Sequence, residues 1–250
     1  MSAPDLTVLY YTANRIAAPF QTAVMANLRT SVGPSTPVIG VVQNANYHDA
    51  DRIQTTLRPD ALFWVNDAPP SIAQVYRNIL MAAEAATTPY VAMAEDDTLY
   101  VPEHFTLHRP ASDTFAYNSQ RLVISRRLSA DGTRREAFYY YRPRTQMAMG
   151  LCRRELLIDT LRERFAKHPN PPLDTTVAKK AGWGEPGRYE KNLGLPPRTL
   201  ERFPWTARPN VTFNHSESLM GRRRVNPDDA IFTTTEPWGH ADALWSTFHG

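Results

Sequence analysis

The sequence predicts an α/β fold with a mostly parallel sheet that is flanked by helices. In the first hundred residues, short apolar and β-prone runs alternate with stretches of helical periodicity. These runs lack the polar alternation of a half-exposed strand, so we expect strands that are buried on both faces. Strands of this kind, separated by helices, are typical of a parallel sheet that is covered on both sides.

Four strands and two helices are expected before residue 102. The strands are placed at residues 6–11, 37–42, 61–65 and 90–94, and the helices at 19–28 and 71–86. Pro19 stands in the first turn of the first helix, where proline is tolerated. Ser71 is a suitable N-cap for the second helix, and its apolar face is formed by Ile72, Val75, Ile79, Leu80 and Ala83.

The composition excludes several classes of protein. The chain has 250 residues, and Cys152 is its only cysteine, which excludes a disulfide framework, a CxxC redox pair and a zinc ribbon. No apolar run reaches the roughly 18 residues of a membrane span, and residues 1–6 do not resemble a signal peptide. We therefore expect a single domain over residues 1–250, with no membrane partner and a cytoplasmic location.

Arginine dominates the basic residues. The chain has 24 arginines and 4 lysines, with a formal net charge of +3. Arginine makes bidentate contacts with phosphate, which suits a nucleotide or nucleic-acid ligand. A GC-rich genome would give the same bias with no function attached, so composition alone leaves both explanations open.

Polar residues follow three of the expected strands. Ligands of such sheets bind beyond the carboxyl ends of the strands. The residues found there are Tyr11, Thr12, Asn14 and Arg15 after the first strand, Gln43 and Asn44 after the second, and Glu95, Asp96 and Asp97 after the fourth. Adjacent carboxylates repel one another unless a cation is present, and oxygen ligands favour Mg²⁺ or Mn²⁺. The alternative is that the acidic triplet only opens a solvated turn before a helix near Pro102.

These residues also occur in the order of a known family motif. An Arg77-Asn78 pair on the expected helix is followed by the strand at 90–94, by Glu95-Asp96-Asp97 and by Leu99-Tyr100-Val101-Pro102. This segment resembles the family-two-like nucleotide-sugar glycosyltransferases of the GT-A fold, with Glu95 and Asp97 at the two acidic positions of the metal motif. Residues 10–15 are similar to the exit of the first strand in that family, which lies beside the nucleotide.

The resemblance implies a UDP-sugar donor and Mn²⁺ or Mg²⁺. Residues 1–102 would then bind the nucleotide sugar, and residues 103–250 would bind the acceptor and carry a C-terminal metal and phosphate segment. It assigns donor contacts to Tyr11, Thr12, Asn14, Arg15, Asn44, Arg77, Glu95 and Asp96. Asp97 would bind the metal, and Glu95 would contact the metal or the ribose. Gln43 or Asn44 stands where the family usually has a base-binding aspartate.

The C-terminal region offers a further metal ligand. His215 follows an alternating strand at 210–214, and a Gly221-Arg222-Arg223-Arg224 run comes after it. GT-A enzymes often complete the metal site with a C-terminal histidine and hold the diphosphate with a basic segment. The resemblance therefore implies His215 as a metal ligand and Arg222 and Arg223 as diphosphate contacts, while a lone histidine can also be structural.

Two carboxylates are candidates for the catalytic base. Residues 171–183 resemble the region that holds this base in inverting members of the family, which implies Asp174, with Glu185 in reserve. Asp174 could equally be the N-cap of a helix that begins at Thr175. The sequence leaves the stereochemistry open, because a retaining enzyme needs no such base.

An arginine-rich hairpin is expected in the second half. The runs at 121–128 and 136–141 flank Asp131-Gly132, which is a strong turn signal. Its arginines and aromatic residues suit a phosphate backbone and unstacked bases. The predicted acceptor contacts are Arg126, Arg127, Arg134, Arg135 and Tyr140. The alternative is a hairpin with its charges in solvent and its aromatic side chains buried.

The function expected from these features is metal-dependent glycosyl transfer to a hydroxyl group. The overall layout loosely resembles phage enzymes that glycosylate 5-hydroxymethyl pyrimidines in DNA, so DNA is the predicted acceptor and a host cytoplasm the predicted location. Two other functions are compatible with the sequence. One is transfer to a saccharide or polysaccharide acceptor, and the other is a non-catalytic nucleic-acid-binding module on the same scaffold.

Overall fold

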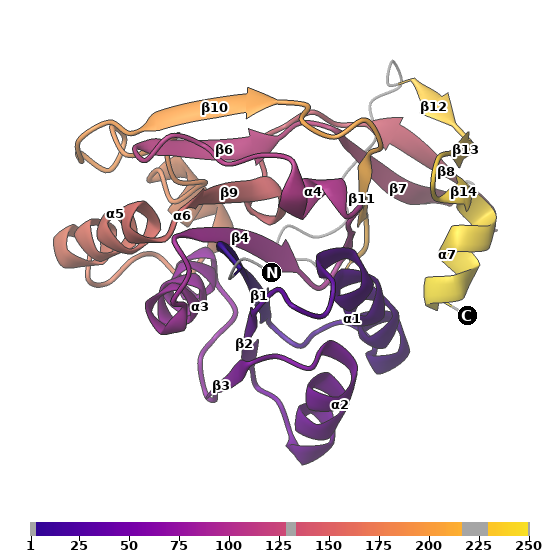
Figure 1. Ribbon diagram of the computed structural model, residues 1–250, viewed down its shortest axis with the longest axis horizontal. Helices are drawn as coiled ribbons and strands as arrows, with labels where there is room; N and C mark the ends of the chain where they lie inside the picture. The colour runs from indigo at the N-terminus through magenta and orange to yellow at the C-terminus, as the bar shows by residue number, and fades with distance from the viewer. Residues whose placement is uncertain (1–3, 129–133, 217–229, 250) are drawn as a thin grey trace.

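The computed structural model describes residues 4–128, 134–216 and 230–249 (Figure 1). Its main sheet has seven strands in the order β10-β6-β9-β4-β1-β2-β3. Their bounds are β1 Leu6–Thr12, β2 Val38–Gln43, β3 Ala61–Val65, β4 Tyr90–Glu95, β6 Thr114–Asn118, β9 Gly150–Arg153 and β10 Thr199–Phe203. All neighbours pair in parallel except β9, which is antiparallel to both β4 and β6. The carboxyl ends of the other six strands therefore lie at one edge.

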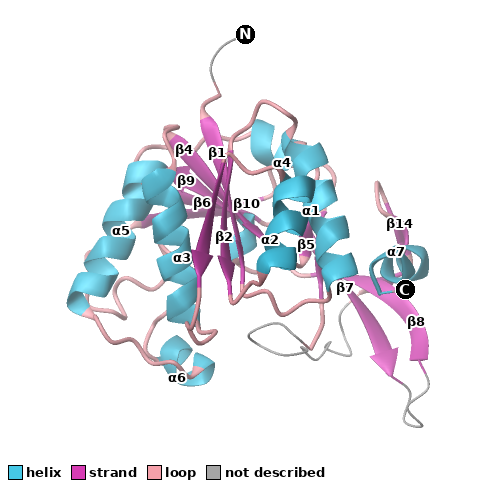
Figure 2. Cartoon of the chain, turned by 90° about the horizontal axis from the view of Figure 1, so that it is seen from below, coloured by secondary structure: helices cyan, strands magenta, loops and turns pink. Residues whose placement is uncertain are grey.

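Helices cover both faces of this sheet, as the sequence predicts. Figure 2 shows α3 (Ile72–Ala85) and α5 (Arg154–Lys167) on one side, and α1 (Ala18–Val32) and α2 (Tyr47–Leu57) on the other. Strand β1 serves both layers because its side chains alternate: Leu9 packs with the α3 and α5 layer, and Val8 packs with the α1 and α2 layer.

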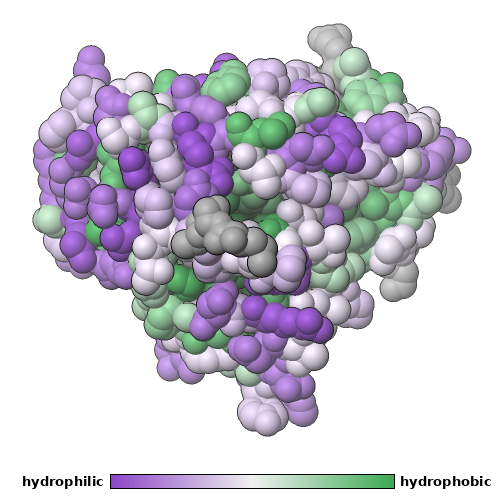
Figure 3. Space-filling model, in the orientation of Figure 1, coloured by the Kyte–Doolittle hydropathy of each residue, from purple (hydrophilic) through white to green (hydrophobic). Residues whose placement is uncertain are grey.

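Helix α2 was not predicted from the sequence. Of its residues only Ile53 and Leu57 are buried, which is too short an apolar stripe to produce a clear helical period. Its start is instead fixed by a capping box between Asn46 and Asp49. Hydrophilic side chains cover this lower tip of the molecule in Figure 3.

A second sheet of five strands adjoins the first, in the order β12-β8-β7-β11-β5. Its strands are β5 Thr98–Leu99, β7 Arg121–Leu128, β8 Arg134–Tyr141, β11 Asn210–Phe213 and β12 Ile231–Phe232. β7 and β8 pair as the expected hairpin, although the Asp131-Gly132 turn lies outside the described residues. The short strands β13 (Thr234–Thr235) and β14 (Gly239–His240) form a separate pair before α7 (Ala241–His249), which packs on β8.

Short helices complete the fold. They are α4 (Glu103–Thr106), η1 (Met147–Met149) and α6 (Thr175–Lys180). Within the described residues, no helix combines the length and apolar character that crossing a membrane requires. Cys152 on β9 is fully buried, and burial raises the pKa of its thiol.

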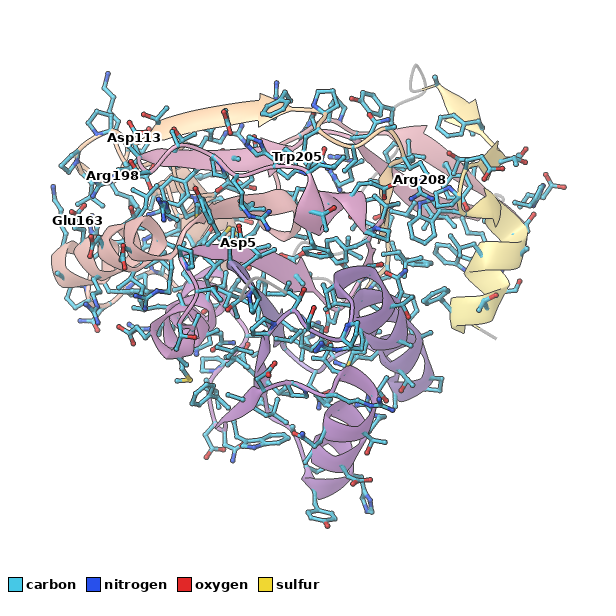
Figure 4. All side chains as sticks on the ribbon, viewed as in Figure 1. Asp5, Asp113, Glu163, Arg198, Trp205 and Arg208 are labelled. Atoms are coloured by element: carbon cyan, nitrogen blue, oxygen red, sulfur yellow. The ribbon has the colours of Figure 1, made fainter. Side chains whose placement is uncertain are left out.

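His104 is a fully buried base in α4. Its ring stacks on Trp205, which Figure 4 labels beside α4, with ring centroids 5.5 Å apart. Its Nδ1 accepts a hydrogen bond from the side-chain amide of Asn210 at 3.0 Å. Burial lowers the pKa of His104 to about 3, because the charged ring would lose its hydration.

We expect His104 to make the protein less stable as pH falls. An unfolded histidine binds its proton near pH 6.5, whereas His104 in the folded chain stays neutral down to about pH 3. Between these values the unfolded state binds more protons, so stability decreases as pH falls. The free energy of unfolding of His104→Gln should change less than that of the natural protein between pH 7.5 and 5.5, by about 1 kcal/mol in urea titrations. The exposed His48 supplies the control, since His48→Gln should keep the full pH dependence; an equal effect of both changes would contradict the assignment.

Candidate active site

A cleft of about 560 Å³ opens at the carboxyl edge of β1 and β4. Segments far apart in the sequence line it, including the exit of β1, the start of α3, the acidic triplet, residues 144–147 and the loop after α6. The predicted site residues among its lining are Tyr11, Thr12, Arg15, Glu95, Asp96, Asp97, Glu185 and His215. The structure therefore brings these eight predicted residues together in one cleft.

Each carboxylate of the triplet is oriented by a different segment. Glu95 accepts a hydrogen bond from the Tyr11 hydroxyl at 2.7 Å and one from the Gln146 amide at 3.3 Å. Asp96 accepts a hydrogen bond from the Thr12 hydroxyl. These contacts connect the end of β4 to the end of β1 and to the segment before η1.

Burial makes this acidic group unfavourable without a cation. Desolvation, together with the nearby charge of Asp97, raises the pKa of Glu95 to about 7, although the Tyr11 hydrogen bond opposes the shift. The same two causes raise the pKa of Asp96 to about 6. A divalent cation would relieve both the repulsion and the lost hydration, so the donor chemistry fits a metal site.

Pairing between β5 and β11 brings His215 to Asp97. Thr98 lies opposite Thr212 in this antiparallel pair, and the amide of Phe213 donates to the carbonyl of Asp97 at 2.9 Å. The Nε2 atom of His215 then lies 3.4 Å from Oδ2 of Asp97, and the other carboxylate oxygen accepts from the Thr98 hydroxyl at 2.9 Å. An imidazole nitrogen and a carboxylate oxygen are suitable ligands for Mn²⁺.

The metal ligand set is incomplete among the described residues. Among the described residues, no group of three or more His, Cys, Asp or Glu side chains is placed to hold a metal ion. Glu95 lines the same cleft as Asp97 and His215. Water or substrate oxygens would have to supply the remaining positions, as is common for Mg²⁺ bound with phosphates.

A fourth carboxylate, Glu185, lines the cleft from the loop after α6. Its Oε2 atom lies 3.8 Å from Nη1 of Arg188. A buried cation fixes this loop: Arg164 donates to the carbonyl of Gly184 at 2.7 Å and also binds the carboxylate of Glu190. The loop that carries Glu185 is therefore fixed at Gly184 before it and at Glu190 after it. Figures 1 and 2 show α6 and the second sheet on opposite sides of the strand ends.

Comparisons with known proteins support the fold. No protein-family model and no curated protein matches the chain. Among solved structures, Staphylococcus aureus TarS 1-349 in complex with UDP-GlcNAc superposes on 90% of this chain with a TM-score of 0.50 and 12% identity. The chain spans 62% of that protein, less than two thirds of its length.

Two further matches are weaker. The mannosyltransferase PcManGT from Pyrobaculum calidifontis, in complex with GDP-Man and Mn²⁺, has a TM-score of 0.42 and 14% identity, with 82% of this chain and 57% of that chain covered. The inositol-1-phosphate CTP transferase from T. maritima has a TM-score of 0.45 and 9% identity, with 84% and 89% covered.

The sheet order, the single antiparallel strand and the match to TarS agree with one another. The chain has the GT-A fold. Its first four parallel strands are those that the sequence predicts, and the fold expectation is confirmed. The 12% identity extends this conclusion to the fold and no further.

On this GT-A scaffold, Asp174 does not line the cleft. Its side chain is exposed and accepts a hydrogen bond from the amide of Val177 at 2.8 Å, so it caps α6. In the structure Asp174 is therefore the N-cap of α6, which is the alternative that the sequence left open. Of the two candidate bases, Glu185 alone is among the residues that line the cleft.

Three predicted donor contacts also lie away from the cleft. Asn14 and Asn44 have positive φ values of 53° and 50° in the turns after their strands, and donate to Asp49 and to the carbonyl of Ala68. Arg77 lies on the side of α3 that faces α5, where its guanidinium stacks on Phe165 at 4.4 Å. The side chains of Asn14 and Asn44 are therefore used in local turns, and that of Arg77 is used in the packing of α3 against α5. Arg222 and Arg223 lie outside the described residues.

Of the predicted acceptor contacts on the hairpin, the two whose side chains the structure describes, Arg126 and Tyr140, do not line the cleft. Arg126 forms an ion pair with Asp242 at 3.3 Å and stacks over Trp245 of α7. Tyr140 is buried, as the alternative interpretation of the hairpin expects. The side chains of Arg127, Arg134 and Arg135 lie outside what the structure describes. The described part of the hairpin therefore serves to dock α7.

Sequence reasoning missed four cations that line the cleft: Arg144, Lys179, Arg188 and Arg202. Arg202 reaches the site because β10 pairs in parallel with β6, where it lies opposite Tyr117. No short-range pattern in the sequence indicates a pairing over that separation. The Gly182 turn (φ 94°) after α6 was the one local signal for a loop at the site.

The buried Arg164 and Glu190 pair should be the costliest anchor of the site to disrupt. Their side chains are 0% and 1% exposed, so Glu190→Gln leaves a buried guanidinium without its charge partner. We expect it to lower the free energy of unfolding by about 3–5 kcal/mol in a denaturant titration. The exposed Glu163 and Arg198 pair, labelled in Figure 4, is the matched control: Glu163→Gln should cost less than about 1 kcal/mol. Equal losses in both variants would contradict the anchoring role.

Proposed function

We propose that this protein is a glycosyltransferase that moves a sugar from a UDP-sugar to an acceptor hydroxyl with the help of a divalent metal ion. The observation that carries the proposal is the Asp97 and His215 pair, 3.4 Å apart and beside two half-buried carboxylates at the carboxyl edge of a GT-A sheet. TarS, which shares the fold, was crystallised with UDP-GlcNAc, and this supports a UDP-sugar as donor.

The donor would lie across the ends of β1 and β4. Tyr11 and Thr12 are fixed there by their hydrogen bonds to Glu95 and Asp96, and exposed Arg15 offers a positive charge to a phosphate. Asp97 and His215 would hold Mn²⁺ or Mg²⁺, which supplies positive charge to the departing diphosphate. The carboxylates would thus both orient Tyr11 and Thr12 in the cleft and attract the cation.

Glu185 would act as general base. It accepts the proton of the acceptor hydroxyl while the hydroxyl oxygen forms a bond to the anomeric carbon of the sugar. The bond between that carbon and the diphosphate oxygen breaks, and UDP leaves with the electron pair. Glu185 and the Asp97 and His215 pair line the same cleft. In the proposed reaction they act on opposite faces of the sugar, so attack and departure invert the configuration.

The acceptor to test first is a 5-hydroxymethyl pyrimidine in DNA. What supports it is the set of arginine and lysine side chains on the cleft lining, in place of the hairpin residues. A saccharide acceptor is the alternative outcome of the same assay, which compares UDP release with hydroxymethylated DNA, unmodified DNA and simple sugars.

The metal-dependent binding of UDP should depend on Asp97. Loss of one ligand charge in Asp97→Asn is expected to weaken UDP binding in the presence of Mn²⁺ by more than about tenfold, measured by calorimetry. Asp51→Asn makes the same change at an exposed position of α2 and should leave binding unaltered. Equal UDP affinity with Mn²⁺ and with a chelator would refute the metal-dependent donor site.

The two candidate bases can be separated by one pair of substitutions. Glu185→Gln should lower kcat about 10²- to 10⁴-fold while UDP affinity is retained, because it removes only the proton acceptor. Asp174→Asn keeps a good N-cap for α6 and should change kcat less than about twofold. The reverse pattern in steady-state kinetics would restore Asp174 as the base and reject Glu185.

A further inference from the structure

Three cations line the same cleft as Glu185, and one of them, Arg188, lies 3.8 Å from its carboxylate. Lys179 comes from α6, Arg188 from the loop that follows, and Arg202 from β10, and all three are exposed residues of the cleft lining. They come from separate elements, so no single amphipathic pattern accounts for their convergence. A general base must lie beside the hydroxyl that it deprotonates, so the acceptor would bind beside Glu185.

Arg202 differs from its charged neighbours in the chain. Glu201 pairs with His108, and Arg198 pairs with Glu163 at 2.6 Å, so both are neutralised on the surface (Figure 4). The side chain of Arg202 makes no hydrogen bond or ion pair with any part of the chain that the structure describes. Arg188 is 47% exposed, and its contact with Glu185 is a long 3.8 Å, which leaves guanidinium donors available.

The donor does not account for these charges. The two negative charges of a UDP-sugar would be matched by a divalent cation at Asp97 and His215, which follow the ends of β4 and β11. Arginine and lysine groups that converge in a cleft are the usual ligands of phosphate, through bidentate and point-charge contacts respectively.

From these observations we infer that the acceptor carries a phosphate group close to its reactive hydroxyl, and that Lys179, Arg188 and Arg202 bind it. The inference rests on the proposed function and adds the residues that would bind a phosphate of the acceptor, whether or not that acceptor is DNA. Binding of this phosphate positions the hydroxyl against Glu185, and it draws Arg188 away from the Glu185 carboxylate, which leaves that carboxylate available to accept the proton.

The test is a calorimetric titration of inorganic phosphate into the full chain saturated with UDP and Mg²⁺. Phosphate should bind with one site per chain, and Arg202→Gln should weaken it about tenfold, the loss expected for a charged hydrogen-bond donor. UDP affinity should not change. Arg162→Gln on α5 is the matched control, because Arg162 is 62% exposed and pairs only with exposed Glu84 among the described residues.

Three results would overturn the inference. The first is that phosphate does not bind. The second is that phosphate displaces UDP, which would assign these cations to the donor. The third is that Arg202→Gln and Arg162→Gln weaken phosphate binding equally. Failure of the proposed function gives a different result. In that case UDP would not bind, while phosphate would still bind the protein without UDP and would still depend on Arg202.

The source of the phosphate is read from two further probes. Glycerol 3-phosphate presents a phosphomonoester, and an unmodified single-stranded oligonucleotide presents phosphodiesters. Tighter binding of the oligonucleotide, lost in Arg202→Gln, would identify a phosphodiester chain as acceptor. Tighter binding of glycerol 3-phosphate would identify a small or terminal phosphate, and failure of both to bind would reject the site.

Discussion

Three consecutive carboxylates at the end of a buried strand are the constraint on which the site depends. Glu95, Asp96 and Asp97 lose hydration and repel one another, so each needs its own hydrogen-bond donor. Those donors come from the end of β1, the segment before η1 and the start of β5. The order of strands in both sheets therefore places these hydrogen-bond donors, and the imidazole of His215, beside one acidic cluster.

The division into two sheets falls within this cluster. Glu95 is the last residue of β4 in the large sheet, whereas Thr98 begins β5 in the small one. Asp96 and Asp97 are thus the junction between them. The strand that pairs with β5 is β11, more than a hundred residues later in the chain, and it places His215 beside Asp97.

Features that depend on continuous apolar runs were predictable from the sequence. Strand β3 has the bounds 61–65 in the prediction and in the structure, and α3 begins after the expected N-cap, Ser71. The same holds for the acidic triplet, because it directly follows an apolar strand. Features that depend on long-range pairing were not: β10 has an exposed and charged sequence, so its alignment with β6, and the arrival of Arg202, could not be foreseen. Asp174 shows a different limit, since a helix cap and a catalytic carboxylate look alike in sequence.

The hydrogen bond from Phe213 to the carbonyl of Asp97 makes the metal pair part of the small sheet. Glu185 belongs to another mechanical unit, because Arg164 ties its loop to α5 on the large sheet. The spacing within the pair is therefore set by the small sheet, whereas the span from the pair to Glu185 depends on how the two sheets meet.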